Sequence, residues 1–126
     1  ILHCLPRNHY VAAVCIASDV VICMDSLDPG SEPSTRVVEQ IEASFQLSGK
    51  YCIKSAICQK QRLSDCLVFA LANVDSVLSG EDISKIVFEQ RTLRSYLVKS
   101  IMVNSMSFPF GRWKTRGGAR VYYRKH

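Results

Sequence analysis

The chain has 126 residues and a mass of 14.1 kDa, with 48% hydrophobic and 21% charged residues. This length accommodates one small domain, and the hydrophobic fraction excludes an intrinsically disordered chain. No apolar run approaches the roughly 20 residues that a membrane-spanning helix needs, so no membrane partner is expected. Because the first residue is Ile1 and not Met, we expect the sequence to be N-terminally incomplete.

The net charge of +5 belongs to the C-terminal end of the chain. Six of the 16 basic residues lie within 112–126, which contains no acidic residue. Residues 1–111 therefore contain ten basic and 11 acidic residues. The basic residues alternate with aromatic ones, a pattern that favours a weak contact with nucleic acid through residues 111–126. The alternative is a solvated linker. We therefore predict a domain at 1–110 and a basic tail or linker at 111–126.

The six cysteines are predicted to be free thiols of an intracellular protein, located in the nucleus or cytoplasm. They are Cys4, Cys15, Cys23, Cys52, Cys58 and Cys66. Most lie in apolar, strand-like runs, where a free cysteine behaves as a small hydrophobic residue, and no secretory signal pattern precedes them. There is no Cys-x-x-Cys pair in the sequence, so neither a structural zinc site nor a cofactor is expected.

The N-terminal half of the chain is predicted to form a hairpin, a helix and a third strand. Two β-rich apolar runs at 10–16 and 20–24 flank a three-residue connection, which is typical of a hairpin. After a loop rich in turn residues, Ser34 is predicted to cap a helix whose apolar residues recur at helical spacing up to Gly49. The run at 51–58 is predicted to be the third strand.

The C-terminal half is predicted to form two helices. The segment 66–78 is apolar nearly all the way round, which indicates a helix buried at the centre of the fold, with Ser64 and Asp65 as its cap. A last helix is predicted over 88–104, where apolar residues recur at every fourth position. The order strand, strand, helix, strand, helix, helix indicates an α+β domain in which helices pack against a small sheet.

The hairpin brings a histidine and a carboxylate together. If the hairpin is centred on Ser18, residue 11 faces residue 25. His9 and Asp25 are then diagonal neighbours on one face of the sheet, roughly 7–8 Å apart at the backbone. A register shift of one residue would place them on opposite faces. A histidine at this position is either structural or catalytic.

Cys66 is a candidate nucleophile because it lies in the first turn of the buried helix. Unpaired backbone N–H groups and the helix dipole favour a thiolate there. A histidine that takes the thiol proton and an acid that orients the histidine complete a catalytic triad, here Cys66, His9 and Asp25. Gln61 or Gln59, just ahead of the cysteine, is a candidate donor to a developing oxyanion. The alternative is that Cys66 is simply the first residue of an apolar helix.

Four short segments, in this order along the chain, resemble one known family of enzymes. They are Asn8-His9-Tyr10-Val11, Asp25-Ser26-Leu27, the glutamine-containing run 59–66 that ends in Asp65-Cys66, and Arg94 with Tyr96-Leu97. Together they resemble the ubiquitin-like-protein-specific cysteine proteases, the SUMO-protease family related to the adenovirus protease. The resemblance covers about residues 1–110.

This resemblance implies a papain-like cysteine peptidase fold, here as a partial domain. It implies cleavage after the C-terminal diglycine of a ubiquitin-like modifier, either in its precursor or in its conjugates. Carried over by position, Cys66 would be the nucleophile and His9 its base. Asp25 would hold the imidazole, and Gln61 would line the oxyanion hole.

The chain departs from the family pattern at three places near the expected site. Leu67 follows the cysteine where the family usually has glycine, and Tyr10 stands at the substrate-binding position where the family has tryptophan. The glutamine spacing is one residue short with Gln61 and one residue long with Gln59. These departures leave an alternative open, in which a catalytically impaired relative binds a ubiquitin-like protein without cleaving it.

Overall fold

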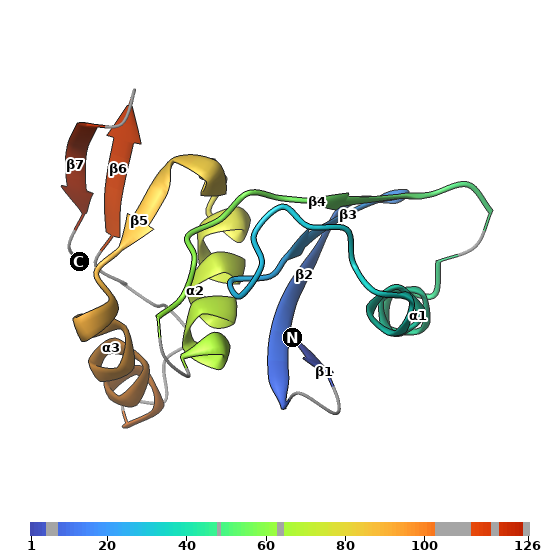
Figure 1. Cartoon of the computed structure of the whole chain (residues 1–126), viewed down its shortest axis with the longest axis horizontal. Helices are drawn as coiled ribbons and strands as arrows, with labels where there is room; N and C mark the ends of the chain where they lie inside the picture. Colours follow the sequence, from blue (N-terminus) through green and yellow to red (C-terminus); the bar gives the residue numbers. More distant parts are fainter. Residues whose placement is uncertain (5–7, 48, 63–64, 103–111, 117–118, 125–126) are drawn as a thin grey trace.

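The computed structural model describes residues 1–4, 8–47, 49–62, 65–102, 112–116 and 119–124. Within these residues, a mixed α/β fold combines a four-stranded sheet, a three-stranded sheet and helices that pack against them (Figure 1). The expected mixture of helices with a small sheet is therefore confirmed. In the described part of the chain, no helix is long and apolar enough to span a membrane.

The first sheet carries the predicted hairpin. Its strands, in spatial order, are β1 (Leu2–Cys4), β2 (His9–Ala17), β3 (Val20–Met24) and β4 (Cys52–Ser55). Ala12 faces Met24 and Cys15 faces Val21, which confirms the predicted register. The pairing shifts after Cys15, so Ala17 faces Val20 and the connection is shorter than the three residues expected. β4 pairs with β3 in parallel, whereas the other neighbouring strands are antiparallel.

Different helices cover the two faces of this sheet (Figure 1). On one face, Val11 and Val21 belong to the same buried cluster as Ile41 of α1 (Thr35–Phe45). On the other face, Ala12 and Met24 belong to a cluster with Phe69 of α2 (Cys66–Leu78). Because successive strand residues point to opposite faces, the apolar runs of β2 and β3 supply both cores.

Both predicted helices that flank the sheet form, with small changes at their ends. The Ser34 hydroxyl accepts a hydrogen bond from the Val37 N–H and caps α1, as expected. The helix ends at Phe45, where Gln46 takes a left-handed conformation with φ of 52°, rather than continuing to Gly49. α2 spans the predicted residues 66–78.

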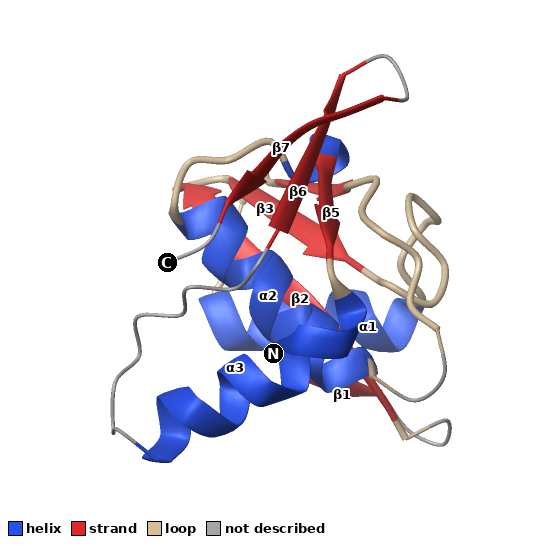
Figure 2. Ribbon diagram, turned by 90° about the vertical axis from the view of Figure 1, so that its left-hand side faces the viewer, coloured by secondary structure: helices blue, strands red, loops and turns tan. Residues whose placement is uncertain are grey.

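The C-terminal part forms a second, antiparallel sheet (Figure 2). Its strands are β5 (Ile86–Phe88), β6 (Arg112–Arg116) and β7 (Ala119–Arg124). Since residues 86–88 form β5, after the short 3-10 helix Ile83–Lys85, the last helix α3 begins later than expected and spans Gln90–Met102. Residues 112–116 and 119–124, which the sequence suggests as a tail or linker, are strands paired with β5 and with each other.

Candidate active site

The hairpin joins His9, at the start of β2, to Asp25, directly after β3. The Nε2 atom of His9 lies 2.6 Å from Oδ1 of Asp25, so the predicted proximity is confirmed. The Leu27 N–H donates to the same carboxylate oxygen at 2.9 Å and holds it in place. The imidazole is buried, with His9 only 7% exposed. Asp25 therefore engages Nε2 of the ring, and Nδ1 is not part of this contact.

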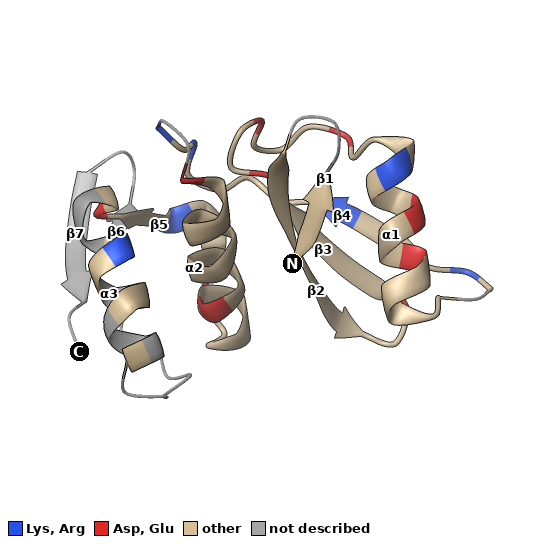
Figure 3. Cartoon of the chain, turned by 90° about the horizontal axis from the view of Figure 1, so that it is seen from below, with Lys and Arg blue, Asp and Glu red and all other residues tan. Residues whose placement is uncertain are grey.

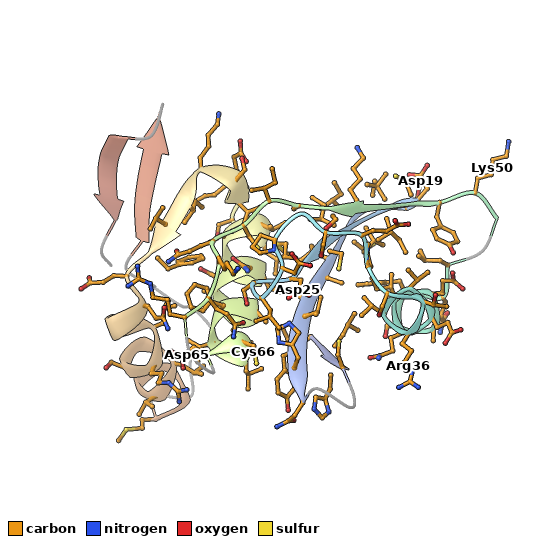
Figure 4. All side chains as sticks on the ribbon, in the orientation of Figure 1. Asp19, Asp25, Arg36, Lys50, Asp65 and Cys66 are labelled. Atoms are coloured by element: carbon orange, nitrogen blue, oxygen red, sulfur yellow. The ribbon has the colours of Figure 1, made fainter. Side chains whose placement is uncertain are left out.

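The Cys66 thiol lies at the start of α2, on a cleft that His9 also lines. Cys66 is the first residue of α2 and is half-buried, and Figure 4 labels it at the lower end of that helix. A cleft of about 460 Å³ runs between the start of β2 and the start of α2. It is lined by Asn8, His9, Tyr10, Leu27, Gln61, Cys66 and Leu67. The structure therefore brings His9 and Cys66 to one cleft, although 57 positions separate them in the sequence.

The two candidate glutamines have different surroundings. Gln61 lines the cleft with Cys66, and its Oε1 accepts a hydrogen bond of 2.6 Å from the Ser26 hydroxyl. The Gln61 N–H also donates to the Ser26 carbonyl at 2.8 Å. The Gln59 amide instead bonds to both the N–H and the carbonyl of Phe88 in β5. The geometry thus favours Gln61 over Gln59 as a side chain that meets a ligand beside Cys66.

Tyr10 is held at the rim of the cleft by a neighbour that the sequence did not single out. The His3 and Tyr10 rings stack with centroids 4.7 Å apart and planes inclined by 18°. These two residues face each other across β1 and β2, and Nε2 of His3 lies 2.8 Å from Oδ1 of Asn8. β1 is only three residues long, too short for its periodicity to reveal this pairing. Leu67 lies 37% exposed on the same rim.

Three other thiols near the His9–Asp25 pair, two of them buried, are held in the protonated form. Burial raises the pKa of Cys23 to about 12, with a further contribution from the negative charge of Asp25. Burial and the same carboxylate raise the pKa of Cys58 to about 11. Burial, Asp25 and Cys66 also raise the pKa of Cys4, which faces His9 across the sheet. All six cysteines are free, as expected for reduced thiols.

The start of α2 differs from the predicted cap. Asp65 occupies the N-cap position, but its side chain makes no capping hydrogen bond. The carboxylate instead bonds to two residues of α3, Gln90 and Arg94. Ser64, the other predicted cap residue, lies outside the described residues. The helix still begins at Cys66, with the Phe69 N–H donating to the Asp65 carbonyl at 3.0 Å.

His9 and Asp25 also line a second cavity, of about 640 Å³. It extends from His9, Asp25 and Cys23 to the N-terminal end of α1 at Ser34 and Arg36. Among the described residues, no cluster of three or more His, Cys, Asp or Glu side chains has the arrangement of a metal site.

No protein-family model matches this chain, and neither a curated protein nor a solved structure is significantly similar to it. The residues that line the smaller cleft are therefore the basis for assigning a function.

Proposed function

We propose that the protein is a cysteine peptidase of papain-like fold in which Cys66, His9 and Asp25 form a catalytic triad. One observation carries the proposal. A buried histidine, bonded through Nε2 to a carboxylate, lines the same cleft as a cysteine at the start of a helix. Nucleophile, base and orienting acid are the three groups that thiol acyl transfer requires.

The chemistry begins with a proton transfer. Asp25 accepts the Nε2–H of His9 and so keeps Nδ1 unprotonated toward the thiol. Nδ1 takes the Cys66 proton, and the thiolate attacks the carbonyl carbon of the scissile bond. The new C–S bond places a negative charge on the carbonyl oxygen. Gln61, which lines this cleft, and the backbone N–H groups at the start of α2 are the donors for that oxyanion.

The reaction ends with two further transfers. When the intermediate collapses, the C–N bond breaks and the imidazolium of His9 gives its proton to the leaving amine. An acyl thioester remains on Cys66. Water then loses a proton to His9 and attacks the thioester, the C–S bond breaks, and the thiolate regains its proton from the imidazolium. No step requires a metal or a cofactor, since thiol and imidazole supply nucleophile, base and acid.

We infer that the substrate is a ubiquitin-like modifier with a C-terminal diglycine, in its precursor or in conjugates. The order of the segments around His9, Asp25 and Cys66 supports this substrate class because it resembles the order in ubiquitin-like-protein proteases. The apolar and aromatic rim, with Tyr10, Leu27 and Leu67, also suits an extended chain that ends in residues without side chains. The free thiols fit a reducing compartment such as the nucleus or cytoplasm.

The test is a modifier whose C-terminus carries a thiol-reactive electrophile in place of the scissile bond. Incubation with a panel of such probes, built on ubiquitin and on SUMO-type modifiers, should add the mass of one modifier to the wild-type protein with at least one of them. Cys66→Ala should remain unlabelled, whereas Cys52→Ala, which removes an exposed thiol away from the cleft, should react like the wild type. Equal labelling of Cys66→Ala would contradict the proposal.

A second function is favoured by one observation, the exposed side chain of Leu67 on the rim beside Cys66. If this side chain blocks entry of the diglycine, the domain binds the modifier without cleaving it. Wild type would then bind the unmodified modifier in calorimetry but stay unlabelled by the probe. Leu67→Gly would gain labelling. Rapid labelling of the wild type rules this second function out.

A further inference from the structure

We propose that Arg94 and Gln90 of α3 are positioning residues for the Cys66 nucleophile, acting by holding the Asp65 carboxylate away from the first turn of α2. The inference rests on the proposed function, because it takes Cys66 as the reacting thiol. Figure 3 shows α3 beside α2, and the two helices are in contact.

The contact is built from several directed bonds. Nε of Arg94 donates to Oδ1 of Asp65 at 2.6 Å, and the Nη2 group of Arg94 pairs with the same oxygen. Nε2 of Gln90 donates to Oδ2 of Asp65 at 2.9 Å, so α3 binds both carboxylate oxygens. The Asp65 side chain is 12% exposed, although that of Arg94 is 62% exposed.

Gln90 also reaches the chain ahead of the nucleophile. Its Nε2 atom donates to the Arg62 carbonyl at 2.7 Å as well as to Asp65. Arg62 directly follows Gln61, the candidate oxyanion donor. The Gln90 amide nitrogen therefore binds both Arg62, which follows Gln61, and Asp65, which precedes Cys66. These two bonds hold Gln61 and Cys66 in position at the cleft.

The first consequence concerns the backbone donors at the start of α2. An N-cap aspartate ordinarily accepts a hydrogen bond from an N–H of the first turn. Asp65 does not, because its two oxygens are engaged by α3. The first-turn N–H groups are thus not taken by this carboxylate, and they are the groups that a thiolate and an oxyanion need.

The second consequence concerns charge. A carboxylate one residue from Cys66 disfavours the thiolate, and a cation bound to that carboxylate offsets the effect. The ionisable groups near Cys66 include His9 and Tyr10 of β2, which line the same cleft, Cys4 of β1, and Asp65 with its partner Arg94 at the α2–α3 contact. Arg94 supplies the positive charge that balances Asp65.

A purely structural role for the Arg94–Asp65 ion pair predicts an effect on unfolding and none on the reactivity of Cys66. The Leu93 side chain is fully buried and anchors α3 in the core. Ion pairs with one exposed partner add little to stability, so removing Arg94 should leave the fold in place. A change in thermal unfolding without a change in Cys66 chemistry would indicate that the contact only joins two helices.

The experiment is a charge cycle on the full chain: Arg94→Gln, Asp65→Asn and the double variant. The rate of iodoacetamide alkylation at Cys66 is measured against pH by peptide mass spectrometry, together with labelling by the electrophilic modifier. Arg94→Gln should move the alkylation midpoint to higher pH and slow labelling at neutral pH about tenfold. The double variant should bring the midpoint back, because it also removes the unbalanced carboxylate.

Two further variants separate charge from geometry. Arg94→Lys keeps the cation but loses the paired contact with Oδ1, so it should keep the wild-type midpoint and label at an intermediate rate. Asp82→Asn combined with Lys85→Gln removes an exposed ion pair whose atoms are 3.6 Å apart and should change neither quantity. An unchanged alkylation profile in Arg94→Gln, or a double variant no better than the single one, would overturn the proposal.

The effect of His9→Ala distinguishes a failure of this proposal from a failure of the proposed function. If His9→Ala slows Cys66 alkylation and modifier labelling while Arg94→Gln does not, the positioning role fails and the peptidase assignment stands. If neither His9→Ala nor Arg94→Gln changes them, both fail.

Discussion

Replacing Asp25 by asparagine tests the electrostatic role of the carboxylate without changing its size. His9 is nearly buried, so an effective dielectric constant of about 20 describes the pair better than that of water. Unit charges with centres about 4 Å apart then interact by about 4 kcal/mol. The amide oxygen of the Asp25→Asn variant would still accept the Nε2–H, which retains about 1 kcal/mol of neutral hydrogen bonding. The imidazolium formed during catalysis therefore loses about 3 kcal/mol, and kcat/KM should fall by about 10²-fold.

The assay is release of a fluorophore from the C-terminal diglycine of a modifier, with kcat and KM measured separately. The loss should appear in kcat, because the imidazolium exists only after the proton transfer. Asp19→Asn is the matched control. Asp19 lies at the exposed hairpin turn at the far end of β2 and β3 from Asp25, as Figure 4 shows. Full activity in Asp25→Asn, or an equal loss in Asp19→Asn, would contradict an electrostatic role for the Asp25 carboxylate.

Three further predictions concern other parts of the chain. Gln61→Ala should reduce kcat by about 10²-fold because one oxyanion donor is lost. Gln59→Ala should instead lower the free energy of unfolding, because the Gln59 amide hydrogen-bonds to Phe88 of β5. Equal losses of kcat in both variants, without a change in unfolding, would contradict this assignment. The ordinary thiol pKa is 9.0, and the pKa of Cys23 in the folded protein is about 12. The free energy of unfolding should therefore fall as pH rises between these two values, because the Cys23 thiol loses its proton in the unfolded chain first. Urea titrations of Cys23→Ala across this range should show a smaller fall, and an identical one would exclude the effect. Binding of single-stranded nucleic acid should weaken steeply with salt and be lost when the six basic residues within 112–126 are replaced by glutamine, whereas persistent binding would place the contact elsewhere.

The local sequence pattern was sufficient to predict the long, periodic elements of the fold. The register of the hairpin centred on Ser18 could be predicted from the two-residue repeat of the strands and the short turn between them. This register places His9 beside Asp25. The helix at 66–78 was predictable because apolar residues occur on nearly every side of it and the segment stops at Gly80. The expected Ser34 cap also forms, since its hydroxyl needs only a partner three residues away.

Contacts made by short or distant segments could not be predicted in this way. β1 and β5 have three residues each, fewer than a recognisable alternation requires, so the sheets are larger than expected. The side chain of Asp65 favoured a local cap, but tertiary partners in α3, 25 and 29 positions away, compete for the same oxygens. The choice between Gln59 and Gln61 likewise depended on the position of Phe88 in β5.

The claim that Cys66 is the nucleophile is tested most directly by trapping the acyl intermediate. A modifier extended beyond its diglycine is mixed with the protein, quenched in acid after a short interval and analysed by mass spectrometry. The expected product is a modifier joined to Cys66 through a thioester, which accumulates in the wild type and is absent from His9→Ala. Cleavage of the substrate with no adduct on Cys66, or an adduct on another of the six thiols, would contradict the assignment of Cys66 as the nucleophile.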